Sequence, residues 1–439
     1  MKISGIRQLE TGRVLRAVMC AFTAAFLIGA LLAPDVRDML PGFRRICTGP
    51  AQLTRDLFKP ELGSISGAML NGFLVGAVCC ALMFLPGAKV NGGTVLAYFL
   101  TLGFFSFGIN ALNMLPLMLG VAVYSFIRRQ PLGSNLNHFM FATAVSPLIS
   151  QLLFYYPVAN ETPALTLTGV ALALAVGIVF GCAMPAVCAH AQSFHKGYNL
   201  YNAGPAAGFL CFLIYAVLYR TLGVEAPAIV AVLGDGDRAF VNAFCIAVFA
   251  LTLVCGIAIN GGVRGYGQLL LETGYRTDFT AKYPVGIDLM NMGIYGLFIV
   301  LYYNVIGARA TGPTMGVVFC MVSCCCSGAT PLNVLPIMIG YGIASLFGSA
   351  AINAQAIVVG LCFASGLAPI SGEYGVVAGI VAGALHYCLV TSVPAIHGGF
   401  NLYNGGFTAG IVCFVLVPVL EHWSRPAARR GRGRDAETR

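Results

Sequence analysis

The chain has 439 residues, of which 58% are hydrophobic and only 9% are charged, and its formal net charge is +9. Soluble domains carry about 25% charged residues, so this composition excludes a large water-soluble protein. Two runs without a charged residue, 90–127 and 310–372, are long enough for two and three membrane crossings of about 20 residues each. Helices are expected rather than a β-barrel, because the runs lack the alternation that barrel strands show.

Apolar segments follow one another along the whole chain. In chain order they are 13–33, 67–86, 93–110, 112–127, 138–157, 164–190, 203–221, 239–260, 286–306, 313–328, 332–348, 353–371, 374–393 and 403–421. The first has the layout of a signal peptide, but we expect it to be retained because 239–260 is its counterpart. Segments 34–66 and 261–285 are predicted as loops with short surface helices. The sequence predicts an all-α polytopic transmembrane helical bundle of about 12–14 segments.

The two halves of the chain repeat each other in order. At an offset of 220, "LNMLPLMLG" (112–120) matches "LNVLPIMIG" (332–340), and near 222 "FATAVSP" (141–147) matches "FASGLAP" (363–369). After an insertion of roughly 20 residues in the first half, the offset becomes 202. The matches favour Gly, Pro and Asn over Leu and Val, whereas chance similarity between apolar segments would do the reverse. We therefore predict a duplication, with membrane repeat 1 at 1–225, membrane repeat 2 at 226–424 and a basic cytoplasmic tail at 425–439.

The number of segments in each half predicts the orientation of the repeats. Seven segments per half would invert the second half relative to the first. The basic residues at both chain ends favour cytoplasmic termini, in a multi-pass protein of the bacterial inner (plasma) membrane. An alternative stays open, because 93–110 and 112–127 are joined almost directly and one of them can be re-entrant. Six crossings per half would make the repeats parallel.

One polar phrase occurs twice, as "HKGYNLYNAG" from His195 and "HGGFNLYNGG" from His397. In one interpretation Asn202 and Asn404 cap the last helix of each half, and the tyrosines lie at the membrane interface. In the other, both segments meet near the midplane and line a path for a solute, as paired helix ends do in transporters. The candidate solute-binding residues are Asn199, Tyr201, Asn202, Asn401, Tyr403 and Asn404, joined by Asn113 and Asn333 of the Leu-Asn-x-Leu-Pro phrase.

The prolines, histidines and cysteines each allow a structural interpretation, and some of them also allow a functional one. The Leu-Asn-x-Leu-Pro phrase suits either a packed kink or the same path. His195 and His397 are either interfacial residues or candidates for proton coupling. Sixteen cysteines, mostly inside apolar runs, favour helix packing over disulfides or zinc binding. The common phosphate-binding, zinc-protease and serine-hydrolase motifs do not occur, so we expect no metal, no cofactor and no enzymatic activity.

The paired Asn-Leu-Tyr-Asn phrases resemble an uncharacterised family of bacterial polytopic integral membrane proteins, known as a domain of unknown function. This resemblance covers nearly the whole chain and implies no particular chemistry. The phrases "GYN" (197–199) and "GFN" (399–401) are also similar to a Gly-aromatic-Asn phrase of urea transporters. That resemblance implies passive conduction of a small neutral amide, with Asn199 and Asn401 lining the pore.

The sequence thus predicts a transporter or channel for a small polar solute, with its path between two pseudo-symmetric halves. A membrane-embedded enzyme is the first alternative, and it requires an asymmetric cluster such as His386 with Glu373. A non-transporting assembly protein is the second. The expected partners are membrane lipid and the solute, without nucleic acid, and homo-oligomerisation is left open.

Overall fold

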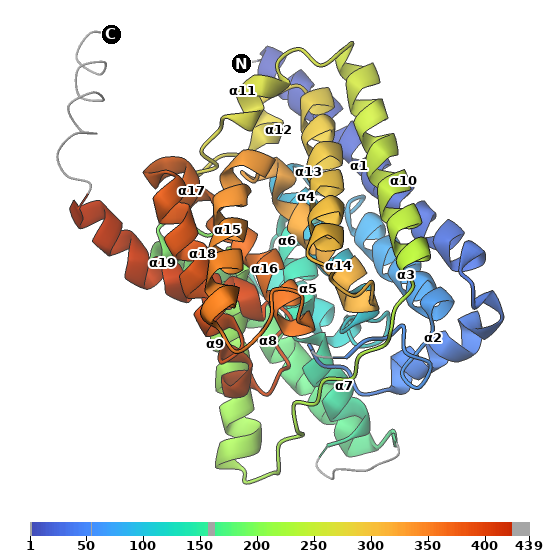
Figure 1. Cartoon of the computed structure of the whole chain (residues 1–439). Coiled ribbons are helices and arrows are strands. Elements are labelled where there is room, and N and C mark those ends of the chain that lie inside the picture. The colour runs from blue at the N-terminus through green and yellow to red at the C-terminus, as the bar shows by residue number, and fades with distance from the viewer. Residues whose placement is uncertain (1, 54, 157–162, 424–439) are drawn as a thin grey trace.

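The computed structural model describes residues 2–53, 55–156 and 163–423 (Figure 1). Within these ranges the regular structure is helical, apart from an isolated bridge between Arg55 and Val232. Eight helices have the length and apolar composition of a membrane span, and five shorter apolar helices accompany them. The predicted all-α class is confirmed, and the protein is a multi-pass integral membrane protein. The predicted tail, 425–439, lies outside the described residues.

The helices follow the predicted segments closely. The first half contains α1 (Lys2–Leu32), α2 (Met39–Thr48), α3 (Ile65–Leu82), α4 (Gly92–Gly103), α5 (Leu115–Ile127), α6 (Leu136–Phe141), α7 (Ser146–Phe154), α8 (Leu167–His195) and α9 (Ala203–Tyr215). The second half contains α10 (Arg238–Asn260), α11 (Tyr266–Leu270), α12 (Phe279–Lys282), α13 (Val285–Val305), α14 (Gly312–Val322), α15 (Pro331–Phe347), α16 (Gln355–Ala364), α17 (Ala368–Tyr374), α18 (Val376–Val390) and α19 (Asn404–Trp423). Two predicted segments, 138–157 and 353–371, are each divided in two, because Pro147 and Pro369 start a new helix.

The bundle has two distinguishable ends. At the end that we call the terminal side, Gly12 of α1 packs against Val90, and Lys196 forms an ion pair with Glu421 near the end of α19. At the opposite side, the loop 222–237 approaches the start of α14, where the Asp237 N–H donates to the Ala310 carbonyl. Figure 1 shows α11 and α12 at the terminal side and α7 at the opposite side. The start of α1 and the end of α19 therefore share one side of the bundle.

Two short helices, α4 and α14, run antiparallel through the centre. Ser106 Oγ, at the end of the 3₁₀ turn that extends α4, donates to the Gly312 carbonyl at 2.7 Å, and Ser327 Oγ, just after the matching turn of α14, donates to the Gly92 carbonyl at 3.1 Å. Each helix therefore ends beside the start of the other. Every residue of α14 and every residue of α4 except Gly93 is buried, so both helices are shielded from lipid by the rest of the bundle.

A buried asparagine ties the end of each short helix to its neighbour. Asn71 Nδ2 donates to the carbonyls of Phe105 and Ile109 at 2.8 and 2.7 Å. In the second half, Asn291 Nδ2 donates to the carbonyls 220 positions later, those of Cys325 and Ala329, at 2.7 and 2.9 Å. The last carbonyls of a helix lack intrahelical partners, so an amide side chain from α3 or α13 satisfies them where water is excluded.

Acidic side chains lie at the starts of the same two helices. Asp56 Oδ1 accepts from the Gly312 N–H of α14 at 3.1 Å, and Asp56 Oδ2 accepts from the Gly234 N–H at 3.0 Å. At the start of α4, the Gly92 N–H donates to Thr280 Oγ1, which itself donates to Asp278 Oδ1 at 2.6 Å. A carboxylate favours the positive end of a helix dipole. Each half thus supplies an acidic side chain to the start of the other half's short helix.

Glycine permits close helix crossings at equivalent places in the two halves. In the α5–α8 crossing a Cβ on Gly177 would lie 2.5 Å from Pro116 Cβ, and in the α15–α18 crossing a Cβ on Gly379 would lie 2.8 Å from Pro336 Cβ. Small residues allow such backbone approach in membrane bundles. Both prolines of the Leu-Asn-x-Leu-Pro phrase therefore have a packing role.

The paired contacts repeat the offsets seen in the sequence, 220 in the first part of each half and 202 in the last part. Antiparallel pairing of equivalent helices is the arrangement that two inverted halves would produce. These observations support both the duplication and the inversion of the second half. Both stay predictions, and the inversion is tested by measuring the membrane orientation.

Candidate functional site

Each copy of the polar phrase is a sharp turn between two helices. α8 ends at His195, and Lys196 and Gly197 then adopt left-handed conformations with φ of 53° and 88°. In the second copy the 3₁₀ turn Val393–His397 is followed by Gly398 and Gly399, with φ of 63° and 73°. Residues other than glycine adopt this region at a cost of about 1 kcal/mol or more, which explains why glycine occupies three of the four positions.

Within each copy a histidine and an asparagine hold the turn closed. His195 Nε2 and Asn202 Oδ1 are 2.9 Å apart, and Asn202 Nδ2 donates to the Cys188 carbonyl at 3.1 Å. His397 Nε2 and Asn404 Oδ1 are 3.0 Å apart, and Asn404 Nδ2 donates to the Val390 carbonyl at 3.0 Å. The capping interpretation is wrong, since the amides bond the histidine and the preceding segment instead of the first N–H groups of their own helix.

The aromatic and imidazole rings of the phrases lie in the core. Tyr201 and Tyr403 are each 1% exposed, and His195 and His397 are 2% and 0% exposed. All four side chains are therefore packed inside the protein, and their depth in the membrane, which the interfacial interpretation concerns, stays a prediction. Proton coupling by the histidines stays a prediction.

The two copies touch each other directly. Asn199 Nδ2 of the first copy donates to the Gly406 carbonyl of the second at 2.9 Å. A Cβ on Gly204 would lie 2.4 Å from the carbonyl carbon of Gly406, so the two helix starts meet backbone to backbone. From this contact α9 leads toward the opposite side and α19 toward the terminal side (Figure 1). The expected meeting of the two phrases is confirmed, whereas their role in binding a solute stays a prediction.

Hydrogen bonding differs between the two copies. The Tyr201 hydroxyl donates to the Cys320 carbonyl at 3.1 Å and lies 3.0 Å from Ser365 Oγ. Its counterpart, the Tyr403 hydroxyl, is buried without a hydrogen-bond partner among the described residues, and so is Asn401 Nδ2. The tyrosine hydroxyl and the asparagine Nδ2 are therefore hydrogen-bonded in the first copy and lack a partner among the described residues in the second, whereas both asparagine Oδ1 atoms are bonded alike.

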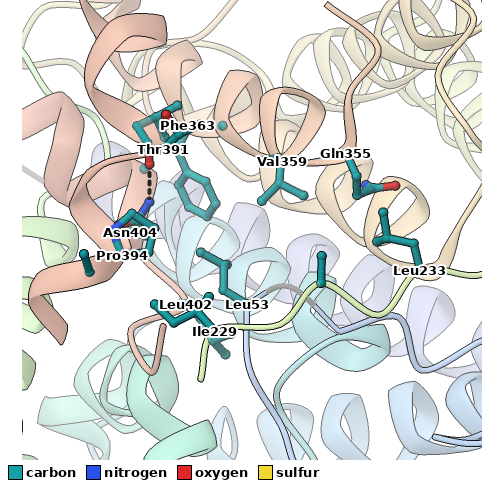
Figure 2. A pocket seen from close by; sticks show the side chains of 16 residues that line it. Leu53, Ile229, Leu233, Gln355, Val359, Phe363, Thr391, Pro394, Leu402 and Asn404 are labelled. Atoms are coloured by element: carbon teal, nitrogen blue, oxygen red, sulfur yellow. Dashed lines mark hydrogen bonds between the residues drawn. The ribbon is translucent and has the colours of Figure 1, made fainter. Parts of the chain in front are cut away.

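A cavity of about 400 Å³ reaches the second copy. Figure 2 shows Asn404, Thr391 and Pro394 on one wall, Phe363, Val359 and Gln355 along α16, and Leu53, Ile229 and Leu402 on a third wall. The loop residues Ile229, Ala231 and Leu233 lie at the opposite side of the bundle, and Asn404 and Gly405 lie at the start of α19. The cavity thus leads from one side of the bundle to the place where the two helix starts meet.

Few polar side chains face this cavity, and none of its described lining residues is ionisable. Gln355 Oε1 accepts from Thr311 Oγ1 at 2.8 Å, and Asn404 is held by His397 and Val390 as described. Thr391 lies at the exposed part of the wall. Such a lining suits a neutral molecule that is largely apolar.

Asn113 and Asn333 are not brought together and do not line the cavity. Asn113 Nδ2 donates to the Gly108 carbonyl at 3.0 Å, and Asn333 Nδ2 donates to the Gly328 carbonyl at 2.8 Å, each in the turn that follows a short central helix. A Cβ on Gly108 would lie 2.4 Å from a methyl carbon of Leu402 in the second copy of the phrase. These two asparagines therefore shape the turns that support the phrases.

The residues proposed for an enzymatic alternative are separated. His386 lies ten residues into α18, about 15 Å along the axis at 1.5 Å per residue, whereas Glu373 precedes that helix. His386 Nε2 lies 2.8 Å from the Gly405 carbonyl, and its Nδ1 lies 2.6 Å from the Tyr341 hydroxyl. Because a carbonyl only accepts, Nε2 carries the hydrogen and Tyr341 donates to Nδ1. His386 thus donates a hydrogen bond to the backbone at the start of α19.

Two contributions could not be found by sequence reasoning. Asp56, Gln355 and Thr391 lie in segments with no resemblance to the polar phrase. Only the folded chain brings Asp56 to the start of α14, and Gln355 and Thr391 to the cavity beside the second copy of the phrase. The sixteen cysteines are free thiols, most of them buried, as the packing interpretation expects.

Comparison with curated proteins and with solved structures finds no match. A family model matches in two ranges, 36–220 and 258–422, whose starts are 222 residues apart and whose ends are 202 apart, the offsets of the internal repeat. Together the ranges cover well over half of the chain. The chain therefore belongs to the family described as protein of unknown function (DUF1576).

Proposed function

We propose that the protein is a transporter or channel for a small neutral solute, with its path between the two halves. The observation that carries this proposal is the cavity of about 400 Å³ that ends at Asn404 and Gly405, where the starts of α9 and α19 meet. Helices that begin inside a membrane protein are typical of solute sites in transporters. Irregular backbone at that depth is tolerated where it lines a cavity or is buried in protein.

The lining suggests the chemistry of the solute. Ligand pockets span roughly 300–1,000 Å³ and combine apolar walls with few polar groups, and this cavity has Leu, Ile, Val and Phe walls with Asn404, Thr391 and Gln355 as polar members. An ion would lose its hydration without a compensating charge. We therefore infer a neutral solute with an apolar body and one hydrogen-bonding end, such as a small amide or alcohol.

The unequal bonding of the two phrases supports alternation between two states. Asn199 reaches the Gly406 carbonyl, while the equivalent Asn401 Nδ2 has no partner among the described residues. In an inverted repeat the alternative state would exchange these roles, so that Asn401 bonds the Gly204 carbonyl and the cavity opens toward the terminal side. Transporters built from inverted repeats alternate by moving one part against another around a fixed site.

Proteoliposomes containing the full chain test the proposal by stopped-flow light scattering. The probes are urea, acetamide, butyramide and glycerol, each applied as an osmotic gradient. At least one probe should enter faster than it enters protein-free vesicles. Ala395→Trp, at an exposed position that lines the cavity, should abolish this excess. Ser392→Trp, three residues away, exposed and outside the cavity lining, is the matched control and should retain it.

Three results would speak against solute conduction. Equal rates for protein-containing and protein-free vesicles with every probe would favour the assembly-protein alternative. Equal loss in Ala395→Trp and Ser392→Trp would show that the cavity is not the path. Chemical conversion of a probe would favour the enzymatic alternative.

A further inference from the structure

A second cavity, of about 430 Å³, lies at the terminal side between residues 11–16 of α1 and the start of α4. Its lining includes Arg13 and Arg16 of α1, Lys89 and Asn91 before α4, and Asp278 and Thr280 beside α12. None of these residues belongs to the cavity that the proposed function uses.

The charges of this cavity are unbalanced. Three basic side chains face it against one carboxylate. None of the three forms an ion pair within 4 Å in the part of the chain that the structure describes. The single carboxylate, Asp278, already accepts from the N–H and hydroxyl of Thr280, at 3.0 and 2.6 Å. The cavity therefore carries an uncompensated positive charge.

Arg16 is positioned to bind rather than to extend into water. Its Nε atom is buried and has no hydrogen-bond partner among the described residues. Its guanidinium carbon lies 5.7 Å from the centre of the Phe84 ring, and that ring is 68% exposed. The arginine is thus fixed beside an apolar surface, with donors left for a ligand.

The start of α4 also borders the cavity, with Asp278 partly offsetting its positive dipole end. Asn91 lines the cavity and caps α4, accepting from the Thr94 N–H at 3.2 Å. The helix dipole places partial positive charge at this end, and arginine donors match the oxygens of a phosphate group. Arg13 and Arg16 lie in the N-terminal part of α1, within the candidate membrane span Glu10–Leu32, and basic residues near the end of a span favour the headgroup region.

We propose that this cavity binds a phosphate-bearing anion, either the headgroup of an anionic phospholipid or a free phosphate. Arg13, Arg16 and Lys89 supply the charge, and the exposed ring of Phe84 lies where an acyl chain would begin. The proposal does not depend on solute conduction. It adds a binding site on the side of the bundle where α1 starts and α19 ends.

Binding is measured on the full chain in detergent, by native mass spectrometry and by melting temperature. The probes are phosphatidylglycerol, phosphatidylcholine and inorganic phosphate. The variants are Arg13→Gln with Arg16→Gln, and Lys89→Gln alone. Arg44→Gln, which removes an exposed arginine of α2, is the matched control. Melting temperatures without added probe verify that each variant is folded.

We expect phosphatidylglycerol to bind and stabilise the native chain and Arg44→Gln more than phosphatidylcholine does. The double variant should bind phosphatidylglycerol about 30-fold more weakly, because each basic residue near an anionic surface contributes a similar increment of binding free energy. Lys89→Gln removes one basic residue instead of two and should therefore weaken binding less. If inorganic phosphate gives the same stabilisation with the same variant dependence, the ligand is a soluble phosphate. Equal binding of phosphatidylglycerol by the folded double variant and by Arg44→Gln overturns the proposal. So does the absence of any preference for phosphatidylglycerol or inorganic phosphate over phosphatidylcholine.

Discussion

Gly204 and Gly406 approach so closely that a Cβ on Gly204 would lie 2.4 Å from the carbonyl carbon of its partner. The two residues occupy equivalent positions, 202 apart, in the two copies of the polar phrase. A contact between equivalent residues is what a pseudo-twofold axis produces where it passes through a molecule. The point where α9 and α19 begin is therefore the centre of the arrangement.

Gly204→Ala should destabilise the protein by about 1–3 kcal/mol or more, because the added methyl group meets backbone that cannot rotate away. The free energy of unfolding, or the melting temperature in detergent, measures this. Gly342→Ala is the control, since a Cβ there would meet nothing within 4 Å inside α15. That change should be neutral or stabilising by about 0.5–1 kcal/mol. Equal effects of the two substitutions would mean that the helix starts are not in contact.

Asn199→Ala should destabilise the protein more than Asn401→Ala. The two residues are equally buried, and each accepts from the N–H two positions later at 3.0 Å, but only Asn199 also donates across the centre to Gly406. Both substitutions remove the same volume, so the difference isolates that bond and should be about 1 kcal/mol. Matching melting temperatures for the two variants would show that the two phrases are bonded alike.

The sequence was sufficient for the helices and for the meeting of the phrases. Uncharged runs such as 310–372 leave the backbone no partner in lipid except its own helix, and a duplicated phrase with a symmetric partner is expected near the symmetry axis. The hydrogen bond between histidine and asparagine that closes each turn was not predictable. Asn202 follows a helix boundary where caps are common, but the left-handed turn at Lys196 and Gly197 brings His195 within 2.9 Å, and the imidazole takes the amide oxygen.

The cavity was also beyond sequence reasoning, for a different reason. Its walls come from Leu53, the loop 229–233, α16 and the end of α18, which are spread between positions 53 and 390 of the chain. None of these segments has an unusual composition, and three of them are as apolar as any lipid-facing helix. Only the packing of α16 beside α19 makes their side chains face one space. The polar phrase thus located the centre of the molecule, whereas the space beside it depends on long-range packing.

Reporter fusions should place the loop after Gly223 and the end of α19 on opposite sides of the membrane. Seven crossings per half predict a cytoplasmic reporter after Trp423, in accord with the basic chain ends, and an external reporter after Gly223. A fusion after Gly262, in the loop beside α11, should match Trp423. Six crossings per half would instead put Gly223 and Trp423 on the same side, which would replace the inverted repeat by a parallel one.

Asp56 should make stability depend on pH. Burial raises the pKa of its carboxyl above the ordinary 3.8, although N–H donors from Phe58, Gly234 and Gly312 oppose the rise. The folded state then holds the proton more tightly than the unfolded state does. The stability that this proton contributes is complete below the unfolded pKa and is lost as pH rises through the folded pKa.

Asp56→Asn should therefore flatten the change in melting temperature between pH 4 and pH 7, because an amide keeps an acceptor for the Gly312 N–H but does not titrate. Glu61→Gln is the control, since it removes an exposed carboxylate from the same loop. We expect the control to keep the pH dependence of the native chain. If Asp56→Asn keeps it as well, the carboxyl group has the same pKa in the folded and unfolded states, which means that its three N–H donors balance the effect of its burial.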